Sequence, residues 1–478
     1  MKLFSFILIF ILSANVFAQT DLFWSEPTIV SAQQNVFRPR IDLVNGDIPV
    51  IVWGNSSDRR IYFSKELSGI FTGAQPINLS REAFIADWTG PEMAASGDTI
   101  YVVFSSYPGS ASESYLIRSF DAGNTFSDTI RVDSLASGEM SRFPSVAIRP
   151  GGNPVVNYMI YAPSGEEYAI TQSPDGGNSF LPKKIVSMIA PGSVCDCCPA
   201  QPVVDGNRQV LLFRNNDNNK RNIWAAISTD DGATFNLSKD IDQTDWIINA
   251  CPSTGPDGHI SGDTIWAVWA SAADGKRKIY ISSSVMNDLA MTARKTIFDM
   301  SASGSQQNFP RIAGSGDTIG VVWQHLTAGK SIILFSYSAS GFAGIGNKID
   351  TVSTVALGQI NPDITFANGV FHITFTDSYN DHIIYRKAGF QPVGIAESKP
   401  EQLISIYPNP ASDKIIISSG DVGQTTITVY NILGVKMIEE ELNGNSKAID
   451  TSTLPKGIYF VQITIDGKRE FVKQVLVQ

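Results

Sequence analysis

One short pattern, S-x-D-x-G-x-[ST]-F, occurs three times at nearly equal spacing. The copies lie 54 and 55 residues apart, at Ser119–Phe126, Ser173–Phe180 and Ser228–Phe235. The Asp of each copy can accept hydrogen bonds from main-chain N–H groups two or three residues further on, and the Gly supplies the positive φ of a tight turn. The final Phe returns the chain to a buried strand. The pattern therefore predicts a chain built from repeated units, with a tight turn between strands in each.

A period of about 50 residues is typical of a β-propeller, in which each repeat forms one small sheet. Runs of β-branched and aromatic residues predict one equivalent strand in each of seven units. These runs are Ile48–Trp53, Thr99–Phe104, Pro154–Tyr158, Val210–Phe213, Thr264–Trp269, Thr318–Trp323 and Val370–Phe375. The apolar runs are too short for helices, so an all-β fold is expected.

An X-Pro step precedes each of these strands, and seven steps indicate seven blades. The prolines are Pro39, Pro91, Pro144, Pro199, Pro252, Pro310 and Pro362. The last unit lacks a clear fourth strand, whereas Phe23–Val30 resembles a fourth strand with no unit before it. We therefore expect a seven-bladed β-propeller in which this N-terminal segment completes the last blade, which removes two open sheet edges.

The three copies of the pattern resemble the Asp-box, or BNR repeat, of sialidases and related β-propellers. The resemblance implies that the box is a structural turn between the outer strands of a blade. Asp121, Asp175 and Asp230 are accordingly expected to stabilise turns rather than to catalyse a reaction.

The first 18 residues have the features of a secretory signal peptide: basic Lys2, an apolar run from Leu3 to Leu12, and Val16-Phe17-Ala18 before the cleavage point. No later stretch is long and apolar enough to cross a bilayer. The net charge of −10 gives no sign of nucleic-acid binding. The predicted organisation is a signal peptide (1–18), a β-propeller (19–392), a linker (393–402) and a separate C-terminal unit (403–478).

The C-terminal unit has short strands of its own. Its pieces include Ile406–Pro410, Thr426–Asn431, Leu454–Val461 and Lys473–Gln478. Together they resemble the type A sorting domain of the type IX (Por) secretion system of Bacteroidetes. The resemblance implies a small Ig-like sandwich and a partner in the secretion machinery. It also implies a protein that is released or attached to the outer cell surface after the tail is removed.

In a propeller with this strand order, residues beside the X-Pro steps and after the second strands surround a central pocket on the face opposite the boxes. No cofactor is expected there. The expected pocket residues are Arg40, Trp88, Glu92, Arg142, Asn215, Trp246, His325 and Asp377.

Resemblance to sialidases would add catalytic roles, because that family binds the substrate carboxylate with three arginines. Arg38, Arg214 and Arg311 are the candidates, with Asp87 as the acid. Two departures argue against a sialidase: the family has six blades, and no Tyr is well placed as nucleophile, with Tyr161 and Tyr379 as the only suggestions.

All four cysteines fall at the starts of two neighbouring units, as Cys195-Asp196-Cys197-Cys198 and Cys251. In an exported protein, two disulfides are expected, with three possible pairings, and a Cys198–Cys251 bond would join the two blades. The alternative is a thiolate site for Cu(I) or Zn, although C-x-C-C is a tight spacing for zinc.

Three functions remain open from the sequence. The first is an exported propeller that binds a glycan or protein at the cell surface. The second is a glycoside hydrolase of the sialidase type, with carboxylates flanking the scissile bond. The third is a surface metal-binding protein that uses the cysteines.

Overall fold

The computed structural model describes residues 21–299, 304–353, 357–390, 404–419, 425–432, 434–442, 444, 446–465 and 469–478. The chain divides into two compact units, Met1–Gln391 and Pro392–Gln478. The expected signal peptide (1–18) and linker (393–402) lie outside the described residues. Helix is confined to two short 3-10 turns, η1 (Gly109–Ala111) and η2 (Gly341–Ala343), in this part of the chain. None of its helices has the length and apolar character needed to cross a membrane.

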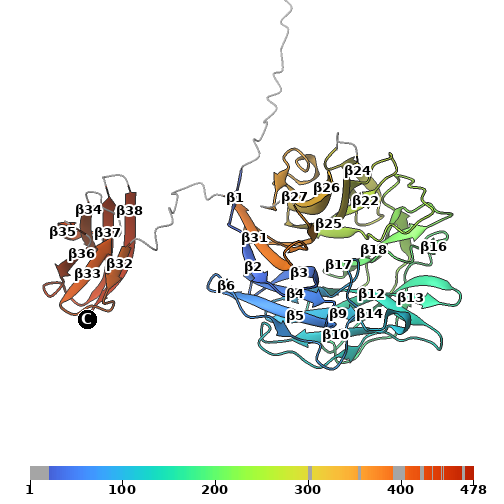
Figure 1. The fold of residues 1–478 in the computed structure, drawn as a ribbon, viewed down its shortest axis with the longest axis horizontal. Helices are drawn as coiled ribbons and strands as arrows, with labels where there is room; N and C mark the ends of the chain where they lie inside the picture. Colours follow the sequence, from blue (N-terminus) through green and yellow to red (C-terminus); the bar gives the residue numbers. More distant parts are fainter. Residues whose placement is uncertain are drawn as a thin grey trace, which may run out of the picture. The chain divides into compact units, whose positions relative to one another are not determined.

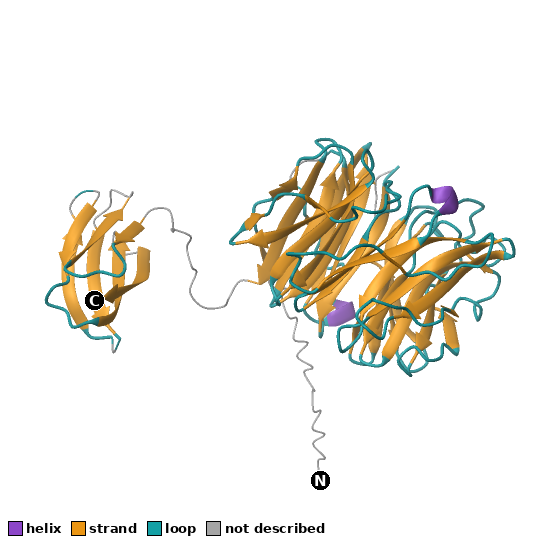
Figure 2. Ribbon diagram, turned by 90° about the horizontal axis from the view of Figure 1, so that it is seen from below, coloured by secondary structure: helices purple, strands orange, loops and turns teal. Residues whose placement is uncertain are grey.

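The first unit consists of seven antiparallel sheets, numbered here in chain order (Figures 1 and 2). Sheet 1 has β3 (Val36–Val44), β4 (Ile48–Asn55), β5 (Arg60–Leu67), β6 (Ile70–Phe71) and β7 (Gln75–Pro76); sheet 2 has β8 (Glu92–Ser96), β9 (Thr99–Ser105), β10 (Ser114–Ser119) and β11 (Ile130–Arg131). Sheet 3 has β12 (Met140–Ile148), β13 (Pro154–Ala162), β14 (Gly165–Gln172) and β15 (Lys184–Ile185); sheet 4 has β16 (Ser193–Val194), β17 (Gln201–Asp205), β18 (Arg208–Asn216), β19 (Ile223–Ser228) and β20 (Leu237–Asp240).

The remaining sheets follow the same order. Sheet 5 has β21 (Asp257–Ser261), β22 (Thr264–Ser271), β23 (Lys278–Val285) and β24 (Met291–Thr296); sheet 6 has β25 (Gln306–Ser315), β26 (Thr318–Thr327), β27 (Lys330–Ser338) and β28 (Asp350–Thr351). Sheet 7 has β29 (Gln359–Ala367), β30 (Val370–Asp377) and β31 (His382–Phe390), completed by β1 (Leu22–Trp24) and β2 (Thr28–Ser31). All seven strands predicted from the β-branched runs form. Each is the second strand of its sheet when the short β16, which pairs with the end of β18, is left out of the count.

The sheets follow one another in a closed circle. The first strand of each sheet contacts the first strand of the next, and β29 of sheet 7 contacts β3 of sheet 1. Within the described residues, a hydrophobic core fills each of the seven interfaces between neighbouring sheets. The interface between sheets 7 and 1 is filled by Val30, Val36, Trp53, Ile383 and Tyr385. The apolar residues of both sheet faces are thereby removed from water, which provides most of the stability of such a fold.

The N-terminal segment completes sheet 7, as the sequence predicted. Phe23 pairs with Gly389, and Ile29 pairs with Ile384, so both β1 and β2 lie antiparallel to β31. Figure 1 shows β1 and β2, near the start of the described chain, beside the orange β31. The pairing uses hydrogen-bonding groups of β31 that would otherwise form an open edge.

Three loops with the repeated pattern, which we call the repeat loops (Ser119–Phe126, Ser173–Phe180 and Ser228–Phe235), have the same internal geometry. In the second, Asp175 accepts hydrogen bonds from the Ser179 N–H at 2.9 Å, the Ser179 hydroxyl at 2.7 Å and the Ser173 hydroxyl at 2.9 Å. The main-chain donor lies four residues after the Asp, not two or three as predicted. The other two loops repeat these contacts around Asp121 and Asp230.

Each repeat loop also binds the preceding sheet. Lys65 donates to Ala122 O and to Asn124 Oδ1, and Arg118 donates to Gly176 O in the next loop. Gln172 donates to Asp231 O in the third. Through these contacts, each repeat loop connects its own sheet with the preceding one.

The second unit contains two sheets. One has β32 (Ile404–Tyr407), β33 (Lys414–Ser419) and β36 (Ser446–Asp450), and the other has β35 (Lys436–Leu442), β34 (Thr425–Asn431), β37 (Gly457–Ile465) and β38 (Arg469–Val477). Residues of both sheets, including Ile417, Ile449, Val429 and Val461, form one buried core.

Candidate functional site

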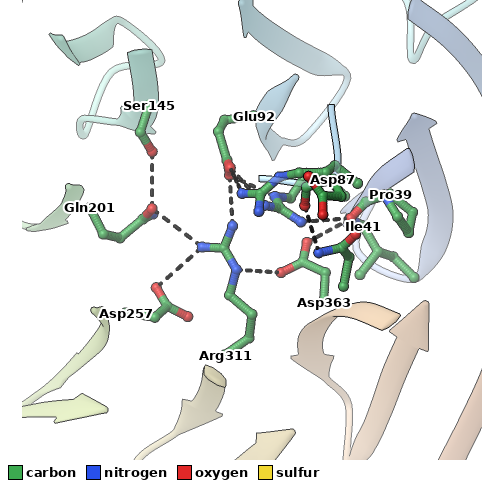
Figure 3. Close-up of polar contacts among 12 residues, drawn as sticks. Pro39, Ile41, Asp87, Glu92, Ser145, Gln201, Asp257, Arg311 and Asp363 are labelled. Atoms are coloured by element: carbon green, nitrogen blue, oxygen red, sulfur yellow. Dashed lines mark hydrogen bonds and ion pairs between the residues drawn. The ribbon is translucent and has the colours of Figure 1, made fainter. Parts of the chain in front are cut away.

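The first strand of each sheet places one residue in a group at the centre of the first unit, which we call the axial ring. Each member pairs with a residue of the second strand, and the next residue of that strand is a buried aromatic. Because this register is the same in all seven sheets, the seven positions are equivalent. The members are Arg40, Glu92, Ser145, Gln201, Asp257, Arg311 and Asp363. Figure 3 shows the labelled members pointing toward one another from strands on all sides.

Glu92 is the centre of charge in this group, because three arginines bind it. Arg40 binds both carboxylate oxygens, with Nε–Oε2 and Nη2–Oε1 distances of 2.7 Å. Arg311 Nη2 lies 2.8 Å from Oε2, and Arg38 Nη2 lies 3.2 Å from Oε1. One internal carboxylate therefore occupies the arginine donors that a substrate carboxylate would need.

Arg311 joins the rest of the ring. Its Nε lies 3.4 Å from Asp363 Oδ1, and its Nη1 lies 3.8 Å from Asp257 Oδ1 and 3.4 Å from Gln201 Oε1. Ser145 donates to the same Gln201 oxygen at 3.0 Å. Three arginines and three carboxylates balance in formal charge, which is how a buried ionic cluster avoids uncompensated charge.

The pKa values reflect this pairing. The guanidinium groups of Arg311 and Arg40 hold the pKa of Glu92 well below its usual range, against the opposing effect of burial. Burial raises the pKa of Asp257 to about 6 and also raises that of Asp363. Burial, together with neighbouring Arg40, lowers the pKa of Arg38 to about 9. Glu92 is therefore a bound counter-ion and not a carboxyl group poised to exchange a proton near neutral pH.

A local irregularity of β3 allows Arg38 and Arg40 to reach the same carboxylate. The register shifts between Phe37 and Arg40, and Arg38 has a φ of 52° immediately before Pro39. Such a bulge redirects a side chain of the strand. On the other side, a Cβ at Gly90 would come within 3.0 Å of Arg38 Cβ, so glycine leaves the space that the Arg38 side chain uses.

Cavities of very different size lie on the two sides of the axial ring. The one lined by Pro199, Thr254, Phe309 and Pro362, on the side where the first strands begin, has a volume of about 30 Å³. That volume accommodates water but no sugar ring. The other measures about 590 Å³ and extends along the first strands to hairpin residues such as Pro150 and Gly206, on the repeat-loop side. The sequence placed the pocket on the opposite side, where the axial ring and surrounding prolines close it.

Arg214, proposed as a third substrate-binding arginine, lies outside the ring. It is fully buried, and its guanidinium donates to the carbonyl oxygens of Thr254, Arg221 and Ala270 at 3.2, 2.6 and 2.8 Å. The buried Trp246 ring lies 5.3 Å from it. Neighbouring Asn215 donates to the Pro191 carbonyl. Through these contacts, Arg214 holds several main-chain segments together.

Asp87 is exposed beside the ring and accepts a hydrogen bond at its main-chain oxygen from Asn361 Nδ2 at 3.1 Å (Figure 3). Neither tyrosine suggested as its partner lies in the cluster. Tyr161 donates to the Asp196 carbonyl, and Tyr379 is 71% exposed after sheet 7. The pairing of acid and nucleophile that a sialidase needs is not formed by these residues.

A group of aromatic side chains surrounds Trp88 and the neighbouring Arg142, and we call it the aromatic surface. Its rings are Phe84, Trp88, Phe143 and Tyr161. Trp88 packs between Phe84 and Phe143, with ring centroids 5.5 and 5.8 Å away. Arg142 lies 5.8 Å from the Phe84 ring and 5.2 Å from that of Tyr161, and it donates to the Gly109 carbonyl. Phe84, Trp88 and Tyr161 are partly exposed.

Two further predicted pocket residues have local partners. His325 is buried against Phe298, and burial lowers its pKa. Asp377 accepts hydrogen bonds from the main-chain N–H groups of Tyr379 and Asn380 at 3.1 and 3.2 Å. Asp377 therefore orders the turn after β30.

The cysteines contain one disulfide, Cys197–Cys251, which joins the loops entering sheets 4 and 5. The sequence predicted two disulfides and named Cys198–Cys251 as one possible pair. Instead, Cys195 and Cys198 are free and buried, and their Sγ atoms lie 2.9 Å apart. The sulfur atoms of Cys195, Cys197 and Cys198 lie within 4.8 Å of one another. Because Cys197 is in a disulfide, only Cys195 and Cys198 remain as possible thiolate ligands of a metal.

Sequence reasoning named Arg142 instead of Ser145 in sheet 3, and it missed Gln201 and Asp257. It chose Pro252 as the X-Pro step of the fifth unit, whereas Asp257, the residue equivalent to Arg40, follows Pro256. In sheet 4, Gln201 lies two residues after Pro199 instead of one. The hairpin fixes the separation in sequence between each ring position and the buried aromatic residue of the second strand. Counting back from that aromatic residue would therefore have identified Gln201 and Asp257.

Residues 405–478 match the family described as the secretion system C-terminal sorting domain. This tail marks the chain for export by the type IX secretion system to the cell surface or the medium. An endo-acting ulvan lyase of Formosa agariphila is 23% identical over 228 residues, which cover 42% of this chain and 43% of the lyase. The chain spans less than half of the length of the curated relatives it matches.

Solved structures show lower similarity. A protein of unknown function from Dyadobacter fermentans is 13% identical, with a TM-score of 0.47, over 77% of this chain and 99% of its own. The Hadza microbial sialidase Hz136 is 13% identical, with a TM-score of 0.43, over 75% of this chain and 66% of its own.

Proposed function

We propose that the seven sheets are the blades of one β-propeller of the Asp-box class, and that the second unit is an Ig-like sandwich. Two observations support the propeller: the cores that fill all seven interfaces, and the contact between β29 and β3 that closes the circle. The two sheets of the second unit, packed around one core, support the sandwich.

We propose that the exported propeller binds a polysaccharide and does not hydrolyse it. The observation that carries this conclusion is the occupation of Arg38, Arg40 and Arg311 by Glu92. A sialidase-type reaction needs arginine donors directed at the substrate. Here the three guanidinium groups are paired with a carboxylate inside the protein, and the cavity on the side where the first strands begin is too small for a sugar.

The aromatic surface is the proposed binding site. Partly exposed rings present flat apolar area with polar edges, and such surfaces suit the faces of sugar rings. Trp88 is held between Phe84 and Phe143, so ligand binding would restrict few additional rotatable bonds of the protein. The similarity to an ulvan lyase and the export signal both favour a polysaccharide outside the cell as the ligand.

The alternative is a glycoside hydrolase that uses exposed Asp87. It requires a second catalytic group close to Asp87, and a turnover assay separates the two functions directly.

Purified protein should be titrated with ulvan and other polysaccharides by calorimetry, with reducing-end and lyase assays on the same samples. We expect binding without turnover. Trp88→Ala should weaken binding about tenfold, a loss of about 1.4 kcal/mol. Phe120→Ala is the matched control, because Phe120 is 50% exposed in a repeat loop on the opposite side of the same sheet. Turnover that Asp87→Asn abolishes would overturn the proposal, and so would equal loss of binding in both aromatic variants.

A further inference from the structure

The four cysteines form two pairs that differ in accessibility. Cys251 is exposed and Cys197 is half-buried, so their disulfide can be reached from solvent. Cys195 and Cys198 are fully buried thiols with their Sγ atoms 2.9 Å apart. A dissolved oxidant can therefore reach the first pair but not the second.

The pairs are close enough to react with each other. Cys197 Sγ lies 3.8 Å from Cys195 Sγ and 3.9 Å from Cys198 Sγ. Disulfide exchange requires a thiolate to approach a disulfide sulfur directly. Cys197 is thus the sulfur that connects the buried pair with the surface.

The surroundings hold the buried pair in position and favour a thiolate. The Cys195 N–H donates to Arg214 O at 2.9 Å, and the Tyr168 hydroxyl donates to Cys198 O. The Cys198 thiol, as hydrogen-bond donor, lowers the pKa of Cys195 to about 7, against the effect of burial and with help from the Arg214 and Arg221 charges. Burial raises the pKa of Cys198. Cys195 is therefore the nucleophile and Cys198 the second thiol.

We propose that the four cysteines form a thiol–disulfide relay in which the Cys197–Cys251 bond oxidises the buried Cys195–Cys198 pair. The Cys195 thiolate attacks Cys197 Sγ, a Cys195–Cys197 bond forms, and Cys251 leaves as a thiolate that takes a proton from water. Cys198 then loses its proton and attacks Cys195 Sγ, which releases Cys197 as a thiolate. The buried pair loses two electrons and the surface pair gains them.

An external disulfide then reoxidises Cys197 and Cys251, so one complete cycle consumes one external disulfide and yields two thiols. Oxidising compartments of exported proteins supply disulfides of this class. The final protein contains two disulfides, and the second forms without direct contact between the oxidant and the buried sulfurs.

Two variants separate this relay from direct oxidation. Cys197→Ser and Cys251→Ser delete the same disulfide, but only Cys251→Ser keeps a sulfur 3.8 Å from Cys195. The full chain is reduced, freed of reductant, checked for native structure by near-ultraviolet circular dichroism, and treated with oxidised glutathione. Remaining thiols are trapped with N-ethylmaleimide and assigned by peptide mapping. We expect Cys195 and Cys198 to be oxidised in the wild type and in Cys251→Ser, and at least tenfold more slowly in Cys197→Ser.

Equal rates in the two variants would overturn the relay, as would a wild-type pair that stays reduced. If a variant does not fold, the order of oxidation in the wild type still tests the relay. The relay requires the Cys197–Cys251 cross-link to appear before the buried thiols disappear, and the reverse order contradicts it.

Discussion

Arg40 and Glu92 form a bidentate ion pair across the boundary between sheets 1 and 2, with both N–O distances at 2.7 Å. Arg311, from sheet 6, binds the same carboxylate at 2.8 Å. Three sheets are thereby connected through one side chain at the centre of the circle.

Glu92→Gln should lower the free energy of unfolding by about 3–5 kcal/mol, because it leaves buried guanidinium groups without their counter-ion. Chemical denaturation of the first unit measures this. Glu82→Gln is the control, since the Arg59–Glu82 pair has the same 2.7 Å distance but lies at the surface and should contribute less than about 1 kcal/mol. Similar losses in both variants would show that the ring is not a buried electrostatic centre.

The pH dependence of stability between pH 6 and 4 should combine opposing contributions from buried aspartates and buried histidines. Burial raises the folded-state pKa values of Asp42 and Asp257 to about 6, so these groups contribute stability that increases as pH falls from 6 to about 4. Burial lowers the folded-state pKa values of His259 and His372 to about 4, so the stability that they contribute is lost over the same window. Glu92 has a lowered pKa, and that of Asp121 is lowered to about 2, so their contributions are present above pH 4 and are lost below it.

Melting temperatures of the first unit, measured from pH 3 to 8, should therefore change little between pH 6 and 4 and should decrease below pH 4. Asp257→Asn removes one contribution that increases as pH falls, so its melting temperature should decrease more than that of the wild type between pH 6 and 4. Parallel pH profiles of the wild type and Asp257→Asn would contradict this prediction.

Gly123 in the first repeat loop should tolerate no side chain. It has a φ of 78°, and a methyl group there would overlap the Phe63 ring of the preceding sheet. Gly46→Ala is the matched control: Gly46 has a φ of 91° but no atom within 4 Å of an added Cβ. We expect a loss of about 1 kcal/mol for Gly46→Ala, from backbone strain alone. Gly123→Ala should cost about 1–3 kcal/mol more, from overpacking. Equal losses would mean that the loop does not pack on sheet 1 as described.

Export should depend on the fold of the second unit. Deleting residues 405–478 should keep the protein within the cell envelope of a host with a type IX system, as judged by fractionation and immunoblotting. Val461→Asp should have the same effect, because Val461 is fully buried in the core of that unit. Gln462→Asp, at the next position of β37, should leave export intact. Secretion of the deleted form at the normal level would contradict this assignment of the tail.

Sequence alone predicted the strands well, because the alternation and the β-branched runs depend on local pattern. Thr264–Trp269, for example, lies within β22 and begins at its first residue. The N-terminal strand was also predictable, since Phe23–Val30 matched an element missing from the last unit.

The axial ring was less accessible to sequence reasoning. Arg40, Glu92 and Arg311 are separated by up to 271 residues, and their contact depends on the register of three sheets. Arg214 looked like a similar residue, but main-chain carbonyls bind it. The choice between Cys197 and Cys198 as the partner of Cys251 was equally undetermined, because adjacent residues can point in opposite directions.

The pairing of β1 and β2 with β31 has a consequence for the order of assembly. Trp24 and its partner Ala388 lie at opposite ends of the first unit's sequence, so this contact closes the longest loop in the unit. Neighbouring sheets can pack as the polypeptide emerges, but the circle stays open until its final portion arrives.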